Sequence, residues 1–370
     1  MTHGKAVPAS AREVLAASTM QAVVLPEFGP PDVLILTRLA KPEPGPGEVR
    51  VRVRSSFVAF GRDVSLRSGK HPVFPRRVTL PHVLGGEHAG TIDAVGAGAD
   101  PSLIGRRVAV SAPVVCGKCE ACEQHRPWDC TARQTVGIQR QGSNAEYTVV
   151  PAGNVQELPV GLGFETAAAF AASGPLAWAE LDAGHLRAGE CLLVPGASGS
   201  VGMLLVSLAR RRGAYVVAAT RGRRAAEDLL ALGADAVVDS DDRELAETLR
   251  QASPHGGVDV VIDNVANVEM WRRYWPAVAR RGRIVLAGQA GNVGQPLPID
   301  VVDFYNRQAT VSGLTIGDPR PVAAFWAELR DQPLVIPDDL VEAFPLARAA
   351  DAHRRIEAGH KIGHVVLSLS

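Results

Sequence analysis

The sequence predicts an α/β protein of two domains, one rich in β-strands and one built on a doubly wound parallel sheet. At 370 residues the chain is too long for one compact hydrophobic core. Residues 20 to about 155 carry short β-type runs broken by Gly and Pro. From about residue 165, apolar strands alternate with helical runs, which is typical of a parallel sheet covered by helices.

The β-rich part has clear period-two alternation. Val49–Arg54 alternates valine with arginine, as a half-buried strand does. The chain ends in another apolar strand, His364–Leu369, which we expect to return to this part. The predicted β-rich domain therefore comprises residues 20–160 and 313–370, and residues 1–19 form an extension before it.

The second predicted domain, residues 161–312, consists of successive βαβ units. Parallel strands need long crossover connections, and helices usually supply them. The predicted strands are Cys191–Pro195, Ala214–Ala219, Ala236–Asp239, Val258–Asp263 and Gly282–Gly288.

Composition excludes several classes of partner. The 39 basic and 39 acidic residues give a formal net charge of zero. The chain therefore lacks the excess positive charge that is typical of nucleic-acid-binding proteins. No apolar run is long enough to span a membrane, and residues 1–19 lack the continuous apolar core of a signal peptide. Four clustered cysteines suit a metal site in a reducing compartment better than disulfides. We therefore expect a cytoplasmic protein with a small-molecule substrate.

A glycine-rich turn follows the first strand of the parallel part and opens a helix. Glycines let the backbone approach a pyrophosphate, and the free N–H groups at a helix N-terminus attract its charge. A plain turn would also explain the glycines, but the flanking strand, helix and βα units favour a dinucleotide site. The predicted cofactor residues here are Gly196, Ser198, Gly199, Ser200, Val201 and Gly202.

The end of the second strand indicates which dinucleotide binds. An acidic residue there would bond the ribose 2′-hydroxyl of NAD, whereas the 2′-phosphate of NADP requires cations. This chain has Thr220, Arg221 and Arg224 and no acid before Glu227. Guanidinium groups bind phosphate oxygens well, which favours NADP. The alternative is that these arginines only form the solvated start of a helix in an arginine-rich protein. We expect NADP(H).

Four cysteines form a C-x2-C-x2-C-x7-C pattern over residues 116–130. Cys116, Cys119, Cys122 and Cys130 can close a tetrahedron of thiolates around zinc and leave no open coordination position. An iron–sulfur cluster uses similar spacing, but no further cysteine lies nearby. The sequence thus predicts a lobe with one structural zinc.

Together these motifs resemble the medium-chain dehydrogenase/reductase superfamily, which includes zinc alcohol dehydrogenases and quinone oxidoreductases. The resemblance extends from Met20 to the C-terminus and also rests on Leu84–Gly90, Ala145–Pro151 and Phe344–Ile356. It implies a GroES-like catalytic domain made from both chain ends, a central Rossmann domain, and an active site between them. It also implies a homodimer or homotetramer.

The chain departs from the zinc-dependent members at the catalytic metal. Those members have a cysteine where this chain has Phe60, a histidine where it has Gly86, and a third ligand near Ser173. With all three replaced, no first shell remains for a catalytic zinc. The resemblance to zinc-free members then implies an NADPH-dependent reductase of an activated C=C bond or a carbonyl on a hydrophobic metabolite. An alcohol dehydrogenase with unusual metal ligands and an inactive NADPH-binding protein are the alternatives.

Without a metal, negative charge that develops on a substrate oxygen must be met by hydrogen-bond donors. His71, in the Gly69–Pro72 element, stands where many zinc-free members have tyrosine. It is either a group that polarises or protonates substrate, or a loop residue without chemistry. Arg62 and Asp63 are expected to face the cleft, although Asp63 could serve only to hold its own loop.

Three further residues, Asn264, Gly288 and Gln289, are placed by the resemblance around the nicotinamide and its ribose. Asn264 follows one predicted strand of the parallel sheet, and Gly288 and Gln289 lie at the end of another. Ligands of such sheets bind beyond the carboxyl ends of the strands.

Overall fold

The structure is a computed structural model that describes residues 18–71, 73–223, 225–288, 296–315, 318–334, 336–359 and 363–370. Arg224 and Gln289, both expected at the cofactor, lie outside the described residues, as do residues 1–17 of the extension.

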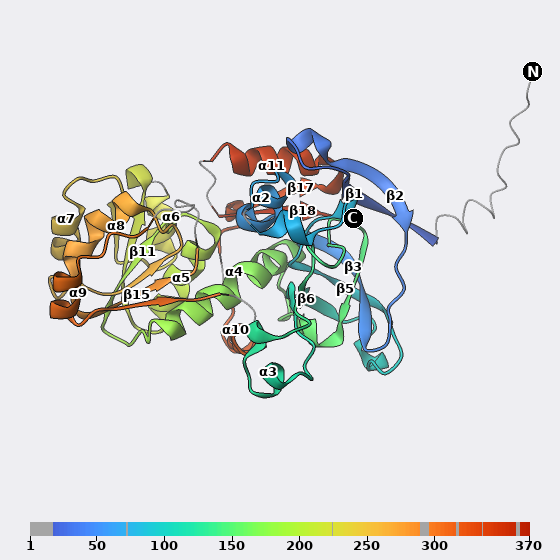
Figure 1. The fold of residues 1–370 in the computed structure, drawn as a ribbon, viewed down its shortest axis with the longest axis horizontal. Helices are drawn as coiled ribbons and strands as arrows, with labels where there is room; N and C mark the ends of the chain where they lie inside the picture. The colour runs from blue at the N-terminus through green and yellow to red at the C-terminus, as the bar shows by residue number, and fades with distance from the viewer. Residues whose placement is uncertain are drawn as a thin grey trace, which may run out of the picture.

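A six-stranded parallel sheet forms the left-hand half of the molecule in Figure 1. Its strand order, β13-β12-β11-β14-β15-β16, reverses direction between β11 and β14, as in doubly wound dinucleotide-binding sheets. Every neighbouring pair is parallel, which confirms the predicted Rossmann architecture. The strands are β11 (Cys191–Pro195), β12 (Tyr215–Thr220), β13 (Ala236–Asp239), β14 (Val258–Asp263), β15 (Val278–Leu286) and β16 (Thr310–Gly313).

Helices cover both faces of this sheet because its strands are apolar on both sides. In β11, Leu192 and Val194 belong to one hydrophobic core, whereas Cys191 and Leu193 belong to the other. The first core is covered by α4 (Phe164–Ala183), α5 (Ser200–Arg211), α6 (Ala226–Ala231) and α10 (Pro319–Asp331). The second is covered by α7 (Leu245–Ala252), α8 (Val268–Tyr274) and α9 (Val301–Arg307).

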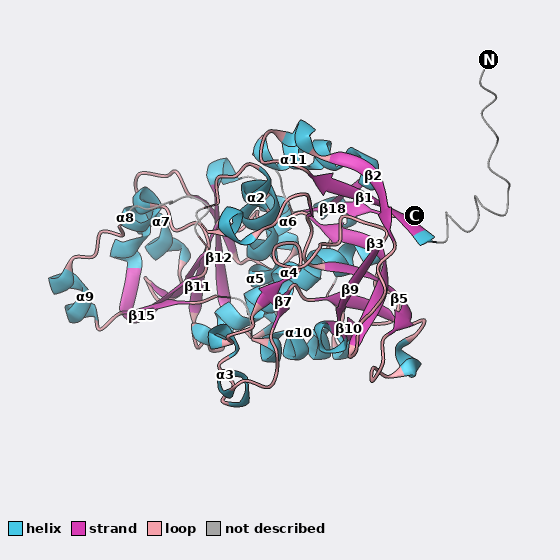
Figure 2. Ribbon diagram, turned by 45° about the vertical axis from the view of Figure 1, so that its right-hand side comes forward, coloured by secondary structure: helices cyan, strands magenta, loops and turns pink. Residues whose placement is uncertain are grey.

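The other half of the molecule is a β-rich domain (Figure 2). Its main sheet has the order β10-β6-β5-β3-β18-β17, with β9 also paired to β3, and β2-β1-β4 forms a second sheet. The terminal strand β18 pairs antiparallel with β3, so the expected return of the C-terminal segment is observed. The strands are β1 (Thr19–Leu25), β2 (Ile35–Ala40), β3 (Glu48–Phe57), β4 (His82–Val83), β5 (His88–Val95), β6 (Arg107–Val110), β7 (Pro113–Val114), β8 (Gln134–Thr135), β9 (Tyr147–Pro151), β10 (Val155–Glu157), β17 (Val341–Pro345) and β18 (His364–Ser368). The helices are α2 (Ser65–Arg67), α3 (Glu120–Glu123) and α11 (Ala349–Glu357).

Helix α4 joins the two halves. Its alanine-rich surface shares one hydrophobic core with Phe57 of the β-rich domain and Val260 of the parallel sheet. Small residues allow close packing here, since a Cβ on Gly174 would lie 2.1 Å from the ring of Phe325 in α10. Residues from both domains can therefore reach one cavity. Within the described ranges, no helix has the length and hydropathy that a membrane span requires.

Candidate active site

A cavity of about 820 Å³ lies between the carboxyl ends of the parallel strands and the β-rich domain. This is the edge of a doubly wound sheet at which ligands bind, because the strand order reverses there. Its position agrees with the expected site between the domains. The lining includes Phe57, Phe60, Arg62, Lys70, His71 and Glu87 from the β-rich domain, Ala172, Ser173 and Leu176 from α4, and Ser200, Val201, Asn264 and Gly288 from the parallel part.

The turn after β11 needs glycine at two positions for packing reasons. Gly196 has a φ of +69°, and a Cβ there would lie 2.7 Å from Cγ2 of Val265. A Cβ on Gly202 would lie 2.6 Å from the Cα of Ala197, so α5 packs directly on the turn that precedes it. These are the constraints that a dinucleotide-binding turn imposes on its glycines.

The first residues of α5 bring the helix N-terminus to the cavity. Ser200 and Val201 begin the helix and line the cavity, so the unpaired N–H groups of its first turn lie at this edge. Ser198 and Gly199 precede the helix and contact the segment before β18. Gly363 N donates to Ser198 O at 3.1 Å, and Gly199 forms a β-bridge with Gly363. The β-rich domain thus holds the cofactor turn in place.

Exposed arginines follow β12. Thr220 is buried at the strand end, and the turn Arg221–Arg223 is exposed. Neither Arg221 nor Arg223 makes an ion pair with another residue in the described part of the chain. One carboxylate lies near the turn: Asp239 Oδ1 accepts hydrogen bonds from the backbone amides of Gly222, at 2.8 Å, and Asp241. These bonds do not involve the arginine side chains. Cationic groups are therefore free where a 2′-phosphate would be read.

Asn264 is held by a buried acid that sequence reasoning missed. Its Nδ2 donates to Oε2 of Glu180 at 3.0 Å, and Glu180 is fully buried in α4. Burial raises the pKa of Glu180 to about 8, against the opposing effect of the bond from Asn264. A Cβ on Gly288 would lie 2.1 Å from the carbonyl oxygen of Asn264, which explains glycine there. The available sequence signal is an acid on the apolar face of the helix, four residues after the cavity-lining Leu176; the two other acids of α4, Glu165 and Asp182, lie near its ends.

Arg62 lies in the π-helical turn Phe60–Val64 after β3. Its guanidinium is held between two carboxylates: Nε and Nη2 donate to Asp63 at 3.1 and 3.0 Å, and Nη1 donates to Glu87. Burial opposes its charge, but attraction to Asp63 and Glu87 raises the pKa of Arg62 above its usual value. Arg62 is therefore a permanent cation at the cavity wall.

Asp63 does not line the cavity, contrary to the expectation that it faces the cleft. Its side chain is fully buried and accepts from Ala59 N at 2.8 Å and from Gly85 N at 3.2 Å, besides its bonds from Arg62. A buried carboxylate is tolerated only with such partners, and although Ala59 and Arg62 line the cavity, Asp63 does not. Asp63 thus fits the alternative expectation that it holds its loop, and with it the guanidinium of Arg62.

His71 lines the cavity, with one ring nitrogen already engaged. Nδ1 accepts from Val73 N at 3.1 Å and from Phe74 N at 3.0 Å, and the ring stacks on Phe74 at 3.6 Å between centroids. Partial burial lowers the pKa of His71. Because Nδ1 is an acceptor, Nε2 carries the hydrogen of the neutral ring. His71 is therefore arranged to donate a hydrogen bond.

The three positions of a catalytic zinc do not fit a metal. Phe60 is 49% exposed at the cavity, and Ser173 lies buried in its wall. At Gly86 a Cβ would lie 2.3 Å from Nη1 of Arg62, so the guanidinium occupies the space of any side chain. In the described part of the chain, the sole group of three or more His, Cys, Asp or Glu ligands close enough to share an ion is the cysteine cluster.

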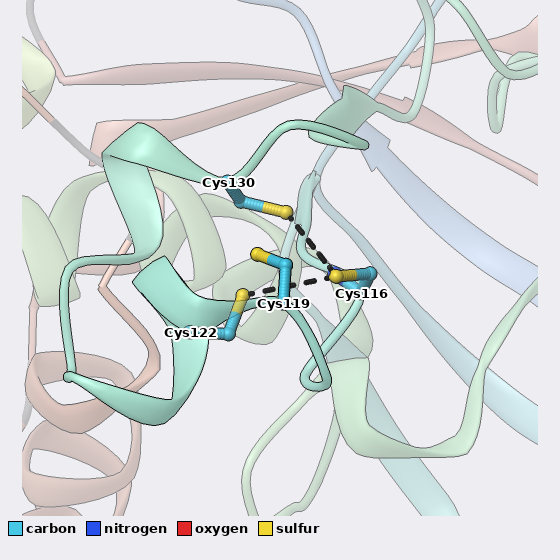
Figure 3. Close-up of side chains that lie close together, drawn as sticks. All are labelled: Cys116, Cys119, Cys122 and Cys130. Carbon is cyan, nitrogen blue, oxygen red and sulfur yellow. Dashed lines mark hydrogen bonds between the residues drawn. The ribbon is translucent and has the colours of Figure 1, made fainter.

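The cysteine cluster does fit a metal. The sulfur atoms of Cys116, Cys119, Cys122 and Cys130 lie within 4.8 Å of one another and point toward a common centre (Figure 3). Cys116 Sγ is 3.6 Å from that of Cys130 and 4.0 Å from that of Cys122. A zinc tetrahedron with Zn–S bonds of about 2.3 Å has sulfur–sulfur edges of about 3.8 Å. The four thiolates would therefore hold one zinc in a closed, structural site.

Comparison with known proteins identifies the family. Residues 45–160 match the alcohol dehydrogenase GroES-like domain, and residues 200–331 match the zinc-binding dehydrogenase family. The L-threonine 3-dehydrogenase of Pyrococcus furiosus is 30% identical over 296 residues, which cover 78% of this chain and 80% of that protein. The chain belongs to the medium-chain dehydrogenase/reductase superfamily.

Solved structures of the superfamily agree with this assignment. The crystal structure of an NAD-dependent alcohol dehydrogenase matches with a TM-score of 0.87 and 32% identity, covering 95% of this chain and 100% of that one. A mycobacterial quinone oxidoreductase matches with a TM-score of 0.75 and 25% identity, covering 95% and 100%. The expected superfamily and fold class are confirmed, and the chain is an oxidoreductase with a nicotinamide-cofactor domain and a zinc-type cysteine lobe.

Proposed function

We propose that the chain is an NADPH-dependent reductase that acts without a catalytic zinc. Its substrate is a hydrophobic metabolite with an activated C=C bond, as in an enone, enoyl or quinone-like group, or with a carbonyl. The observation that carries the proposal is the loss of all three metal-ligand positions, which are Phe60, Gly86 and a stretch without cysteine around Ser173. Phe60 and Ser173 line the same cavity as Ser200 and Val201, which begin the helix after the glycine-rich turn.

NADPH, when bound at the turn after β11, supplies the hydride. On the protein side, Phe57, Phe60 and Leu176 give the cavity apolar walls that exclude water from a hydrophobic substrate. His71 offers Nε2–H as a hydrogen-bond donor for an oxygen that gains charge during reduction. A conjugated substrate suits this arrangement because its negative charge moves away from the carbon that receives hydride.

The preference for NADPH is supported by the free arginines after β12. A structural relative is named NAD-dependent, so membership of the superfamily leaves the choice of dinucleotide open. The exposed Arg221 at the end of β12, with Arg223 beside it, favours a 2′-phosphate over a 2′-hydroxyl.

A substrate panel with both cofactors tests the proposal. Purified protein is assayed with NADPH and NADH against enones, quinones, enoyl thioesters and aldehydes, and with NADP⁺ against alcohols. We expect NADPH oxidation with the conjugated or carbonyl acceptors. Alcohol oxidation that requires a second bound metal would support the alcohol dehydrogenase alternative instead. NADPH binding without turnover of any member would support the inactive binding protein.

We also propose that the protein is a homodimer or homotetramer. Val301, Val302 and Tyr305 of α9 are 69%, 57% and 61% exposed, and together they place apolar surface on one short helix. A second copy that covers this helix would remove it from water. Light scattering at several concentrations measures the mass, and a monomer throughout would contradict this expectation.

A further inference from the structure

We infer that the guanidinium of Arg62 stands in the place of the catalytic metal and supplies the hydrogen bonds that hold the substrate oxygen. This inference rests on the proposed reductase function, which it deepens by naming a second group, besides His71, that donates hydrogen bonds to the substrate oxygen. The superfamily implies a catalytic metal, but the residues of this chain at the three ligand positions do not fit one.

The guanidinium and a metal ligand at position 86 exclude one another. A Cβ on Gly86 would lie 2.3 Å from Nη1 and 2.5 Å from Cζ of Arg62, well inside van der Waals contact. Phe60, at the position of the missing cysteine, begins the same turn as Arg62, and Ser173 lines the same cavity. The cation therefore lies among the three positions that would surround the metal.

Arg62 keeps donors free for a ligand. A guanidinium has five N–H groups, and the bonds to Asp63 and Glu87 use three of them. One N–H remains on Nη1 and one on Nη2, and the side chain lines the cavity. The two carboxylates, which belong to separate segments of the chain, hold the guanidinium in one orientation. The two remaining N–H groups are therefore fixed in position before substrate binds.

Charge balance narrows the substrate class. Asp63 and Glu87 each carry one negative charge when ionised and Arg62 carries one positive charge, so the three together have a formal net charge of −1. Lys70 also lines the cavity, but the cluster itself does not attract anions, and Glu87 would repel a carboxylate placed directly against the guanidinium. The site therefore suits the uncharged oxygen of a ketone, aldehyde, enone or thioester, which gains charge only during the reaction.

When NADPH is bound, a C–H bond of its dihydronicotinamide would break, NADP⁺ would form, and the hydride would make a new C–H bond at the β-carbon or the carbonyl carbon of the substrate. The displaced π-electron pair moves to the oxygen, to which the two free N–H groups of Arg62 donate. Asp63 and Glu87 hold the proton on Arg62, so water, not the guanidinium, supplies the proton that completes the reduction. Arg62 thus acts as a fixed electrophile, the part that a Lewis-acid metal plays in zinc-dependent members.

The first test measures metal content and needs no substrate. A Cβ at position 86 would also lie 2.8 Å from the Cβ of Ala112, so every protein in this test carries Ala112→Gly. In that background Phe60→Cys, Gly86→His and Ser173→Cys are combined, once with Arg62 retained and once with Arg62→Ser as the matched partner. Zinc per chain is measured by elemental analysis after folding is verified by circular dichroism. We expect about one zinc with Arg62 retained and about two with Arg62→Ser. Two zincs in both proteins, or one in both, would overturn the inference, because removal of Arg62 would then not open a metal site.

The second test measures catalysis with the best acceptor from the panel. Arg62→Met removes charge and donors, whereas Arg62→Lys keeps the charge but cannot reach both carboxylates and the substrate. We expect Arg62→Met to lower kcat by about 10²-fold or more with little change in NADPH affinity, and Arg62→Lys to fall between it and the wild type. A kcat within threefold of wild type in Arg62→Met would overturn the inference. If the wild type reduces no acceptor, the proposed function is wrong. The zinc measurement still decides whether Arg62 occupies the position of the catalytic metal.

Discussion

Gly86 lies directly against the guanidinium of Arg62, so closely that any side chain at position 86 would overlap Nη1. The absence of a histidine at position 86 and the presence of the arginine at position 62 are therefore two aspects of one structural feature. A histidine ligand at position 86 would displace the guanidinium, and the guanidinium leaves no room for that histidine. The two residues lie far apart in sequence and meet through the contact between Arg62 and Glu87.

The contact predicts that Gly86→Ala disturbs Arg62. The added Cβ must push the guanidinium from its two carboxylates and also overlaps the Cβ of Ala112 at 2.8 Å. The substitution should cost about 1–3 kcal/mol of stability and also lower kcat. Gly61→Ala is the matched control, because a Cβ at Gly61 would meet no atom within 4 Å. Chemical denaturation of both variants measures the difference. Equal stability in the two would contradict the close contact.

Local sequence patterns predicted the fold well and the active site only in part. The cysteine lobe and the turn at Gly196 are contained in short motifs whose geometry depends on neighbouring residues, and both lie where expected. The partners of Arg62 and Asn264 could not be found in this way. Glu87 is 25 residues from Arg62 and Glu180 is 84 residues from Asn264, so these pairs form only when distant segments of each domain come together in the folded chain. A local sequence pattern also does not show that Asp63 is buried, and for this reason its position outside the cavity lining was not predicted.

Removal of Arg221 should weaken NADPH binding while leaving NADH binding almost unchanged. One lost phosphate contact costs about 1.5–3 kcal/mol, which corresponds to about ten- to a hundredfold in Kd. Combining Arg221→Ala with Arg224→Ala should abolish most of the preference. Fluorescence titration of both cofactors measures it, with the exposed Arg280→Ala as control for the loss of one surface charge. Equal affinity of the wild-type protein for NADPH and NADH would disprove the expected preference.

His71→Phe should lower kcat by about 10²-fold without changing NADPH affinity, if its Nε2–H meets the substrate oxygen. His71→Gln carries an amide N–H at a similar reach and should retain part of the activity. Both variants lose the bonds that Nδ1 accepts from Val73 and Phe74, so the difference between them isolates the donor. Pre-steady-state reduction measures the hydride step directly. An unchanged rate of hydride transfer in His71→Phe would show that His71 is a loop residue that takes no part in the reaction.

Purified protein should contain about one zinc per chain, bound only by sulfur. X-ray absorption should give Zn–S distances of about 2.3 Å, and chelation should lower the melting temperature, because ligand binding and folding of this lobe are coupled. Cys122→Ser should lose the metal, whereas Cys191→Ala should keep it, since Cys191 is buried in β11 apart from the cluster. Nitrogen or oxygen ligands, or two zincs in the wild type, would show that the metal sites have been assigned wrongly.

Two buried histidines should make the protein lose stability in mild acid. His353 and His88 are fully buried, and burial lowers the pKa of each to about 4. In the unfolded chain a histidine has a pKa of about 6.5, so between that pH and pH 4 the unfolded state binds protons that the folded state does not. Their contribution to stability is thus complete above about pH 6.5 and declines as the pH falls, by about 1.4 kcal/mol per pH unit for each histidine.

His353→Leu separates this titration from other causes of acid unfolding. Neither ring nitrogen of His353 has a hydrogen-bond partner among the described residues, so leucine should cost little at pH 7.5. Between pH 6 and pH 5, the free energy of unfolding should then depend on pH less steeply, by the equivalent of one proton. His185→Asn, at an exposed position, serves as control and should leave the slope unchanged. If His353→Leu shows the wild-type slope, His353 already takes up its proton in the folded state, and the acid sensitivity must arise elsewhere.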